Sequence, residues 1–147
     1  MKDILESILL EDLNDIGIFR LTLNDIDNKN ALSESMMHKL IEAISKASKD
    51  NSVKLIVIAS TGNVFCSGHN LKEINEAQKA DDKGESYYLD LFKICSELMQ
   101  SIINCPKPVI AEVNGIATAA GCQLVASCDL AIACLLYTSP SPRDTMS

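Results

Sequence analysis

The residues best suited to ligand binding or catalysis lie in the run Val113-Asn114-Gly115-Ile116-Ala117-Thr118-Ala119-Ala120-Gly121-Cys122-Gln123-Leu124. In this run, small side chains follow the end of an apolar segment. Asn114-Gly115 is a turn signal, and a helix is predicted from about Thr118 to Ser127. The free N–H groups and the dipole at a helix N-terminus favour negative charge, and small residues leave these groups open. Two such donors aimed at a carbonyl oxygen would form an oxyanion hole. The other interpretation is close packing of a helix of small residues.

A second run whose residues could bind a ligand or take part in catalysis is Phe65-Cys66-Ser67-Gly68-His69-Asn70-Leu71-Lys72-Glu73-Ile74. It follows the apolar segment Leu55–Ala59, whose length and β-branched residues predict a strand buried on both faces. The run would therefore lie outside the carboxyl end of a sheet, where open α/β folds bind ligands. Gly68 permits a close backbone approach. The alternative is an ordinary strand-to-helix loop in which Asn70 caps the helix.

These two runs must be positioned by alternating strands and helices. Strands are predicted at 5–12, 18–23, 55–59, 109–113 and 130–134, with a turn at Asn14-Asp15. Helices are predicted from a cap at Ser33 to about Lys49, at 86–104 before Pro106 and Pro108, and at 118–127. Short apolar strands that alternate with helices indicate an α/β domain with parallel strands. Residues 135–147 contain two Ser-Pro steps and no periodicity, and a disordered tail is predicted there.

Composition narrows the class of protein. The 147 residues carry a formal charge of −7, with 47% apolar and 22% charged residues, which indicates one soluble globular domain. The negative charge argues against general nucleic-acid binding, which needs basic patches. No apolar run approaches the roughly 18 residues of a membrane helix. Neither a secretory nor a transit peptide is recognisable at the start, so a cytoplasmic protein is expected.

The cysteines and histidines show no metal-binding pattern. No pair of cysteines has C-x-x-C spacing, and all six are predicted to be reduced, small core residues: Cys66, Cys95, Cys105, Cys122, Cys128 and Cys134. His38 and His69 add no ligand pattern. No metal site is expected.

Taken together and in order, the two runs strongly resemble the crotonase (enoyl-CoA hydratase/isomerase) superfamily. The quoted motifs are F-C-S-G-H-N-L-K-E-I and K-P-V-I-A-E-V-N-G-I-A-T-A-A-G-C-Q-L-V-A-S-C-D-L-A-I-A, preceded by N-A-L-S at 30–33. The resemblance covers about residues 8–134. It implies the N-terminal part of a spiral of ββα units, with a partial core domain at 1–134. Family members are close to twice as long, and 135–147 resembles a non-native sequence appended to unrelated predicted proteins.

The resemblance also implies a site for an acyl-CoA thioester. The oxyanion hole would use the backbone N–H groups of His69 and Ala120. Residues implied in binding coenzyme A are Lys29, Ala31, Ser67, His69, Asn70, Leu71, Lys72 and Ala120. The alternative for either lysine is a solvated surface charge. The His69 side chain is expected to fill the pocket or to make a hydrogen bond rather than to act as a general base.

Gln123 stands where hydratases of this family carry the first of two catalytic glutamates. A glutamine side chain can hold a water or a carbonyl, but it cannot usefully exchange a proton near neutral pH. The second glutamate would lie beyond Asp129, where the resemblance ends. Neither Glu112 nor Asp129 can take over the role on sequence grounds, and Asp129 is expected to pin the turn that follows it.

The expected function is therefore that of an acyl-CoA-binding member of the enoyl-CoA hydratase/isomerase family that polarises a thioester carbonyl, in fatty-acid metabolism. The alternatives are a non-catalytic acyl-CoA-binding or regulatory homologue and a non-functional fragment. Coenzyme A would enter as part of the substrate or ligand, with no separate cofactor and no membrane insertion. A homotrimer or hexamer is implied for the complete protein, and the mitochondrial matrix is the alternative location.

Overall fold

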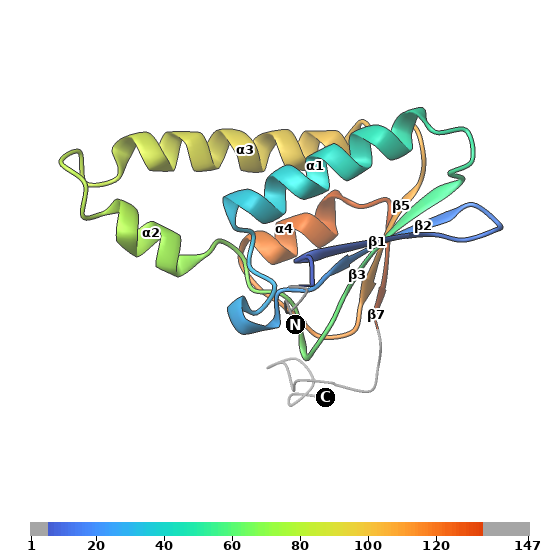
Figure 1. Ribbon diagram of the computed structural model, residues 1–147, viewed down its shortest axis with the longest axis horizontal. Helices are drawn as coiled ribbons and strands as arrows, with labels where there is room; N and C mark the ends of the chain where they lie inside the picture. The colour runs from blue at the N-terminus through green and yellow to red at the C-terminus, as the bar shows by residue number, and fades with distance from the viewer. Residues whose placement is uncertain (1–5, 134–147) are drawn as a thin grey trace, which may run out of the picture.

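The computed structural model describes residues 6–133, in which one sheet carries helices on one of its faces (Figure 1). The sheet has five strands in the order β1-β2-β3-β5-β7. Their bounds are β1 Leu9–Leu13, β2 Ile18–Leu23, β3 Leu55–Ser60, β5 Val109–Val113 and β7 Leu130–Ala133. Strands β1 and β2 form an antiparallel hairpin, and the other neighbours are parallel. The predicted α/β class with parallel strands is thus confirmed.

The predicted strands match the structure closely, with one boundary wrong. The carboxamide oxygen of Asn14 accepts hydrogen bonds from the N–H groups of Ile16 and Ile18, which closes the turn predicted at Asn14-Asp15. Strand β1 begins only at Leu9, later than predicted, and the Ser7 hydroxyl oxygen accepts from the N–H of Leu9 at this end of the strand. The predicted tail at 135–147 lies outside the described residues.

The longer helices confirm the predicted caps and breaks. Helix α1 spans Glu34–Lys49 and is capped by Ser33, whose hydroxyl oxygen accepts from the N–H of Met36 at 3.1 Å. Helix α3 spans Glu85–Ile103 and ends before Pro106. Helix α4 spans Ala120–Ser127. Each helix therefore runs close to its predicted bounds.

Two short strands in the predicted loops were missed, whereas a short helix begins at Asn70, the cap expected in the strand-to-helix alternative. Strands β4 (Val64–Cys66) and β6 (Ile116–Ala117) pair in parallel as a separate two-stranded sheet. Helix α2 (Leu71–Ala77) starts at Asn70, whose carboxamide oxygen accepts from the N–H groups of Lys72 and Glu73. These elements are too short to show a periodic apolar pattern, so tertiary pairing and one cap define them.

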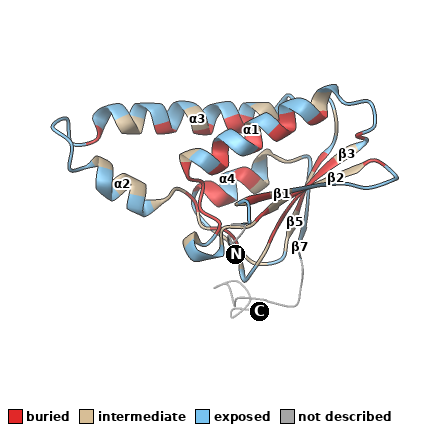
Figure 2. Cartoon of the chain, in the orientation of Figure 1, coloured by how far each residue is buried: buried red, intermediate tan, exposed pale blue. Residues whose placement is uncertain are grey.

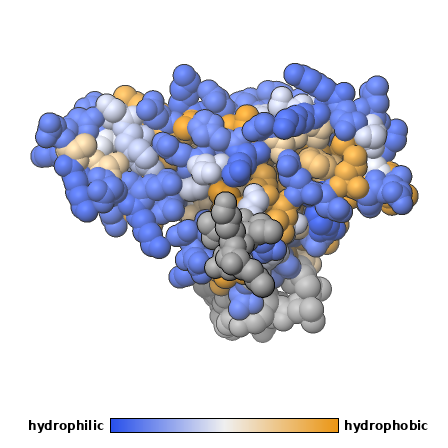
Figure 3. Space-filling view, viewed as in Figure 1, coloured by the Kyte–Doolittle hydropathy of each residue, from blue (hydrophilic) through white to orange (hydrophobic). Residues whose placement is uncertain are grey.

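The core lies between the helices and the sheet (Figure 2). Alternate residues of β2 and β3 point toward the helices, and Leu21 and Ile58 have no exposed surface. Met37 and Leu40 of α1 and Leu98 of α3 are equally buried from the other side. The face in Figure 3 is mostly hydrophilic, with apolar side chains toward its middle and right. Within the described residues, β7 is exposed along its length.

Candidate functional site

Backbone contacts at the end of β4 join the two candidate runs, 65–74 and 113–124. The N–H of Thr118 donates to the carbonyl of Cys66 at 3.0 Å, which continues the pairing of β4 with β6. Gly68 has a φ of +91°, and a Cβ placed on it would lie 3.3 Å from the nitrogen of Ala120. A side chain at position 68 would therefore crowd the start of α4. The structure thus brings the backbone at Gly68 beside the N-terminus of α4.

The N–H groups of His69 and Ala120 are both available for a ligand. Within residues 6–133 neither group donates a hydrogen bond. Ala120 opens α4, where an N–H has no intrahelical partner. Leu32 pairs with His69 as a parallel bridge, but the bond runs from the N–H of Leu32 to the carbonyl of Gly68. Two donors on adjacent segments could bind an oxygen that carries negative charge.

Ala119, immediately before α4, has a strained backbone. Its φ of 51° and ψ of −124° lie in a region that L-residues rarely adopt, and no side chain caps the helix. Strain of this kind costs about 1–3 kcal/mol, and it persists only where surrounding contacts impose it. The contact with Gly68 and the Thr118–Cys66 bond supply that constraint. At this turn the N–H of Ala120 makes no hydrogen bond within the described residues, whereas those of Gly121 and Cys122 donate to the carbonyls of Thr118 and Ala119.

A cavity of about 300 Å³ borders His69. It is lined by Asp27, Asn28, Lys29, Ala31, Ser67, His69, Asn70, Leu71 and Lys72. Seven of the eight residues implied in coenzyme A binding are in this set, and Ala120 is the one left out. The Lys72 ammonium donates to the carboxamide oxygen of Asn28 at 3.2 Å, while Asp27 adds one negative charge to the lining. The cavity combines two ammonium groups with several hydrogen-bonding groups.

Asn30 fixes the loop that carries Lys29, one of the residues that line this cavity. The sequence pattern alone did not show this role. The residue is 1% exposed. Its carboxamide NH₂ donates to the carbonyls of Thr61 and Val64 at 2.9 and 2.8 Å, and its oxygen accepts from the N–H of Asp25 at 2.7 Å. A buried amide with all these partners fixes two loops against each other. The loop that carries Lys29 is thereby tied to the start of β4.

A second cavity, of about 290 Å³, lies between α3 and α4. It is lined by His69, Phe92, Cys95, Ser96, Met99, Gln100, Ile103, Gln123 and Ser127. His69 therefore borders both cavities, and Gln123 borders only this one. The α3 residues were missed because the apolar stripe of a helix does not reveal which positions line a cavity.

The His69 imidazole is partly buried between these cavities. Burial lowers the pKa of His69 below its usual value, and a backbone contact with Leu32 opposes the change. Its Nδ1 atom is buried and has no hydrogen-bond partner among the described residues. A neutral imidazole that fills space between two cavities agrees with the expected pocket-filling role.

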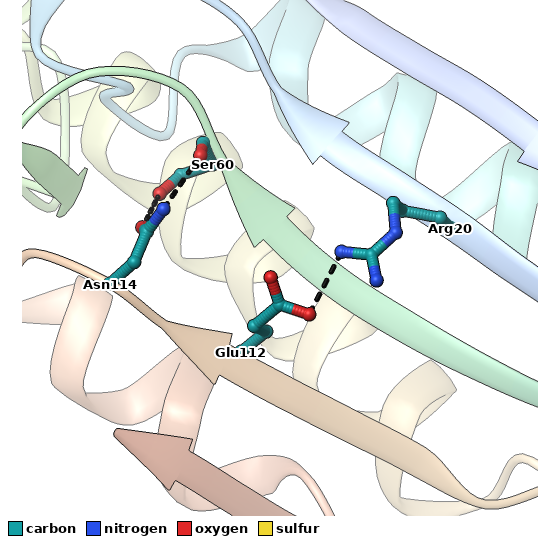
Figure 4. Close-up of polar contacts among 4 residues, drawn as sticks. All are labelled: Arg20, Ser60, Glu112 and Asn114. Carbon is teal, nitrogen blue, oxygen red and sulfur yellow. Dashed lines mark hydrogen bonds and ion pairs between the residues drawn. The ribbon is translucent and has the colours of Figure 1, made fainter. Parts of the chain in front are cut away.

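Glu112 and Asp129 are both engaged elsewhere. A guanidinium nitrogen of Arg20 on β2 donates to the Glu112 carboxylate at 2.9 Å, across the face of β3 that the helices do not cover (Figure 4). The Asp129 carboxylate accepts from the N–H of Val109 at 2.8 Å, and the Asp129 N–H donates to the Val109 carbonyl. Asp129 thus ties β7 to β5 rather than pinning the turn that follows it. Neither carboxylate lines the two cavities.

The prediction of core cysteines holds in part. Cys66 and Cys95 are buried, and burial raises the pKa of the Cys66 thiol to about 11. Cys105 and Cys128 are half-buried. Cys122 is exposed, so the prediction is wrong there, because its position on α4 faces away from the core. Cys134 lies outside the described residues. Between residues 6 and 133, no three His, Cys, Asp or Glu side chains gather as a metal site requires.

Comparison with known proteins decides the family. The model of the family described as enoyl-CoA hydratase/isomerase matches residues 14–135. The chain belongs to the enoyl-CoA hydratase/isomerase family. Solved structures agree with the crotonase-like fold predicted for its N-terminal part. An enoyl-CoA hydratase of Mycobacterium smegmatis superposes with a TM-score of 0.80 and 48% identity, covering 87% of this chain and 48% of that one.

Several relatives are proteins named enoyl-CoA hydratase domain-containing protein 3, mitochondrial, which agrees with the resemblance of G-H-N-L-K-E and A-T-A-A-G-C-Q-L-V-A-S-C-D to that branch. That of Xenopus laevis is 48% identical over 80% of this chain and 38% of its own length. The human protein is 47% identical over 80% of this chain and 37% of its own. The human structure has a TM-score of 0.77, with 41% identity, and covers 86% of this chain and 48% of that one. This chain therefore spans less than half the length of each of these proteins.

We predict that Gly121→Ala destabilises the fold. An alanine Cβ would collide with the carbonyl of Cys66, so α4 must move away from β4. Glycine to alanine inside a helix ordinarily stabilises by up to about 1 kcal/mol, whereas overpacking here should cost about 1–3 kcal/mol. The measurement is the free energy of unfolding in urea, with Ala126→Ser on the exposed side of α4 as control. A stabilised Gly121→Ala protein would contradict the close contact.

We predict that His69 makes the stability pH-dependent near its unfolded pKa. Because burial lowers the folded pKa, the unfolded chain binds the proton more readily. The contribution of His69 is therefore fully present above pH 6.5 and is lost as pH falls from there toward the folded pKa. Urea unfolding at a series of pH values should show this loss in the unaltered protein and less of it in His69→Gln. His38→Gln, an exposed change on α1, should keep the loss.

Proposed function

We propose that the complete protein binds an acyl-CoA thioester and polarises its carbonyl, in fatty-acid metabolism. The observation that carries this proposal is the 300 Å³ cavity, which places Lys29 and Lys72 beside the free N–H of His69. Membership of the enoyl-CoA hydratase/isomerase family supports it. The same family includes a relative named 1,2-epoxyphenylacetyl-CoA isomerase, from Escherichia coli, at 29% identity.

In this proposal each part of the ligand meets a different group. The phosphates of coenzyme A lie near the ammonium groups of Lys29 and Lys72, which they attract as point charges. The thioester oxygen accepts from the N–H groups of His69 and Ala120. When a proton leaves the adjacent carbon, negative charge moves onto that oxygen, and each donor stabilises it by about 3 kcal/mol. The polarised thioester is the common requirement of isomerisation and hydration.

Gln123 favours a second candidate, a non-catalytic acyl-CoA-binding protein. No carboxylate lines the 290 Å³ cavity among residues 6–133. By the family resemblance, Gln123 stands where hydratases carry the first catalytic glutamate. Glutamine can orient a ligand but cannot deliver a proton to it. The two candidates share the binding step and differ only in turnover.

The location and assembly of the complete protein are also proposals. The relatives named mitochondrial favour the mitochondrial matrix over the cytoplasm. A homotrimer or hexamer is proposed from the family resemblance. No helix within residues 6–133 is long and apolar enough to cross a membrane.

We predict that Lys72→Ala weakens the binding of butyryl-CoA by the complete gene product about tenfold. The substitution removes a charge-assisted hydrogen bond to a phosphate. Isothermal titration calorimetry measures the dissociation constant. Lys46→Ala serves as the matched control, because Lys46 lies on α1, where its ammonium pairs with Glu42 at 3.0 Å, and does not line the cavity. Equal affinity in Lys72→Ala and the unaltered protein would show that coenzyme A does not bind in this cavity.

We predict that the complete gene product hydrates a short 2-enoyl-CoA at least about 100-fold more slowly than its Gln123→Glu variant. A positioned general acid or base contributes roughly that factor or more. Loss of the enoyl absorbance measures the rate, and Gln78→Glu at the exposed end of α2 controls for added negative charge. Rapid turnover by the unaltered protein would reject the non-catalytic candidate. A rate that Gln123→Glu leaves unchanged would show that the missing acid is not what limits hydration.

A further inference from the structure

Helix α2 carries part of the 300 Å³ cavity but has little buried surface of its own. Leu71 and Lys72, its first two residues, line that cavity. Within Leu71–Ala77 no residue is buried, although Ile74 is half-buried against the core. Figure 1 shows α2 below the start of α3 and away from the sheet. A helix with so little buried apolar surface depends on polar contacts for a fixed position.

The carboxylate of Glu73 makes the contacts that join α2 to two other helices. Its Oε2 atom accepts from the hydroxyl of Tyr87, near the start of α3, at 3.2 Å. The same atom accepts from the N–H of Glu34 at 3.3 Å. Glu34 is the first residue of α1, so its N–H has no partner within the helix, and a negative charge is favoured there. One carboxylate therefore connects α1, α2 and α3.

The Tyr87 hydroxyl remains a donor at neutral pH. Burial, and after it the charge of Glu73, raise the pKa of Tyr87 to about 12. A hydrogen bond from a hydroxyl to a carboxylate is stronger than one between two neutral groups. Glu34, Glu73 and Tyr87 are all half-buried, which shelters the contact from water in part. The junction can thus fix the position of α2 where packing does not.

Lys72 is the charged group that α2 contributes to the cavity. Its ammonium donates to the carboxamide oxygen of Asn28 at 3.2 Å, and the Asn28 amide donates to both carboxylate oxygens of Asp25 at 3.0 and 3.1 Å. Glu73 follows Lys72 directly, and adjacent residues of a helix point about 100° apart. The two side chains therefore leave α2 in different directions, Lys72 toward the cavity and Glu73 toward α1 and α3.

We propose that Glu73 is a positioning residue, which holds α2 so that Lys72 meets the phosphates of coenzyme A. This inference rests on the proposed acyl-CoA binding. Glu73 is not among the described residues that line the cavity, and its negative charge next to Lys72 would by itself repel a phosphate. Charge and position therefore predict opposite results when Glu73 is replaced. Loss of the charge alone would tighten binding, whereas loss of the contacts between helices weakens it.

Calorimetry with butyryl-CoA on the complete gene product tests the proposal. Glu73→Ala should bind this ligand about fivefold more weakly than the unaltered protein, which is about the contribution of one hydrogen bond. Glu76→Ala is the matched control, because it removes the same charge from an exposed position of α2, where the carboxylate pairs with Lys79 at 2.8 Å. This control should not weaken binding. Tyr87→Phe should weaken binding in the unaltered protein and have no effect in Glu73→Ala.

Lys72→Ala provides a readout that a general structural role would not change. If Glu73 acts by placing Lys72, then Glu73→Ala should weaken binding by less than about twofold in a protein that already carries Lys72→Ala, since the two changes remove one shared interaction. A general weakening of the fold would lower the affinity by the same factor with and without Lys72. An equal loss in both backgrounds would therefore overturn the proposal.

The remaining outcomes separate the inference from the function on which it rests. An affinity in Glu73→Ala that equals or exceeds that of the unaltered protein would overturn the positioning role alone, because acyl-CoA binding would remain. If butyryl-CoA does not bind to the unaltered protein, the proposed function fails and the positioning role fails with it. Circular dichroism identifies a folding defect in Glu73→Ala. In that case Tyr87→Phe decides, and an unchanged affinity in this variant would overturn the role of the junction.

Discussion

The close backbone contact between the end of β4 and the start of α4 is the constraint on which the site depends. Cys66 accepts a hydrogen bond from the N–H of Thr118, and its carbonyl leaves no space for a side chain at Gly121. Two residues further along, Gly68 lies against Ala119 and Ala120, where a Cβ would be 3.1 Å from the Cβ of Ala119. Larger side chains at these glycines would separate the two segments. Because the donors are main-chain N–H groups, their positions follow from this packing rather than from side-chain identity.

Buried polar side chains stabilise the loops around that contact. Asn30 joins the loop before α1 to the segment that leads into β4 through three hydrogen bonds. At the carboxyl ends of β3 and β5, the Ser60 hydroxyl donates to the Asn114 side-chain oxygen at 2.9 Å, and the Asn114 amide donates back to the Ser60 carbonyl (Figure 4). Removing the Asn114 side chain would leave the buried Ser60 hydroxyl without this partner. These pairs fix the loops from which both cavities are built.

The two cavities differ in the charge of the side chains that line them. Ammonium groups border the first cavity, and the second contains only neutral lining groups among the described residues. His69 lies between them, and burial keeps its pKa low. The division fits a ligand with an anionic end and a neutral end, as an acyl-CoA has. The nearby carboxylates of Glu112 and Asp129 are held in structural contacts. The polar side chains of α4 that border the neutral cavity are those of Gln123 and Ser127.

Local sequence determined the long elements and the kinds of chemical group present. The apolar run of β3, the Ser33 cap of α1 and the prolines after α3 act through neighbouring residues, so they could be predicted. The resemblance supplied seven residues that the structure gathers around one cavity. Strands β4 and β6 and the α3 lining of the second cavity could not be predicted, because they depend on which distant segments pack together. The sequence, through its resemblance to the family, named the backbone N–H groups of His69 and Ala120, each beside a glycine, as the donors. Only the tertiary structure decided that these donors, about 50 residues apart, lie on adjacent segments, since packing across the chain sets that proximity.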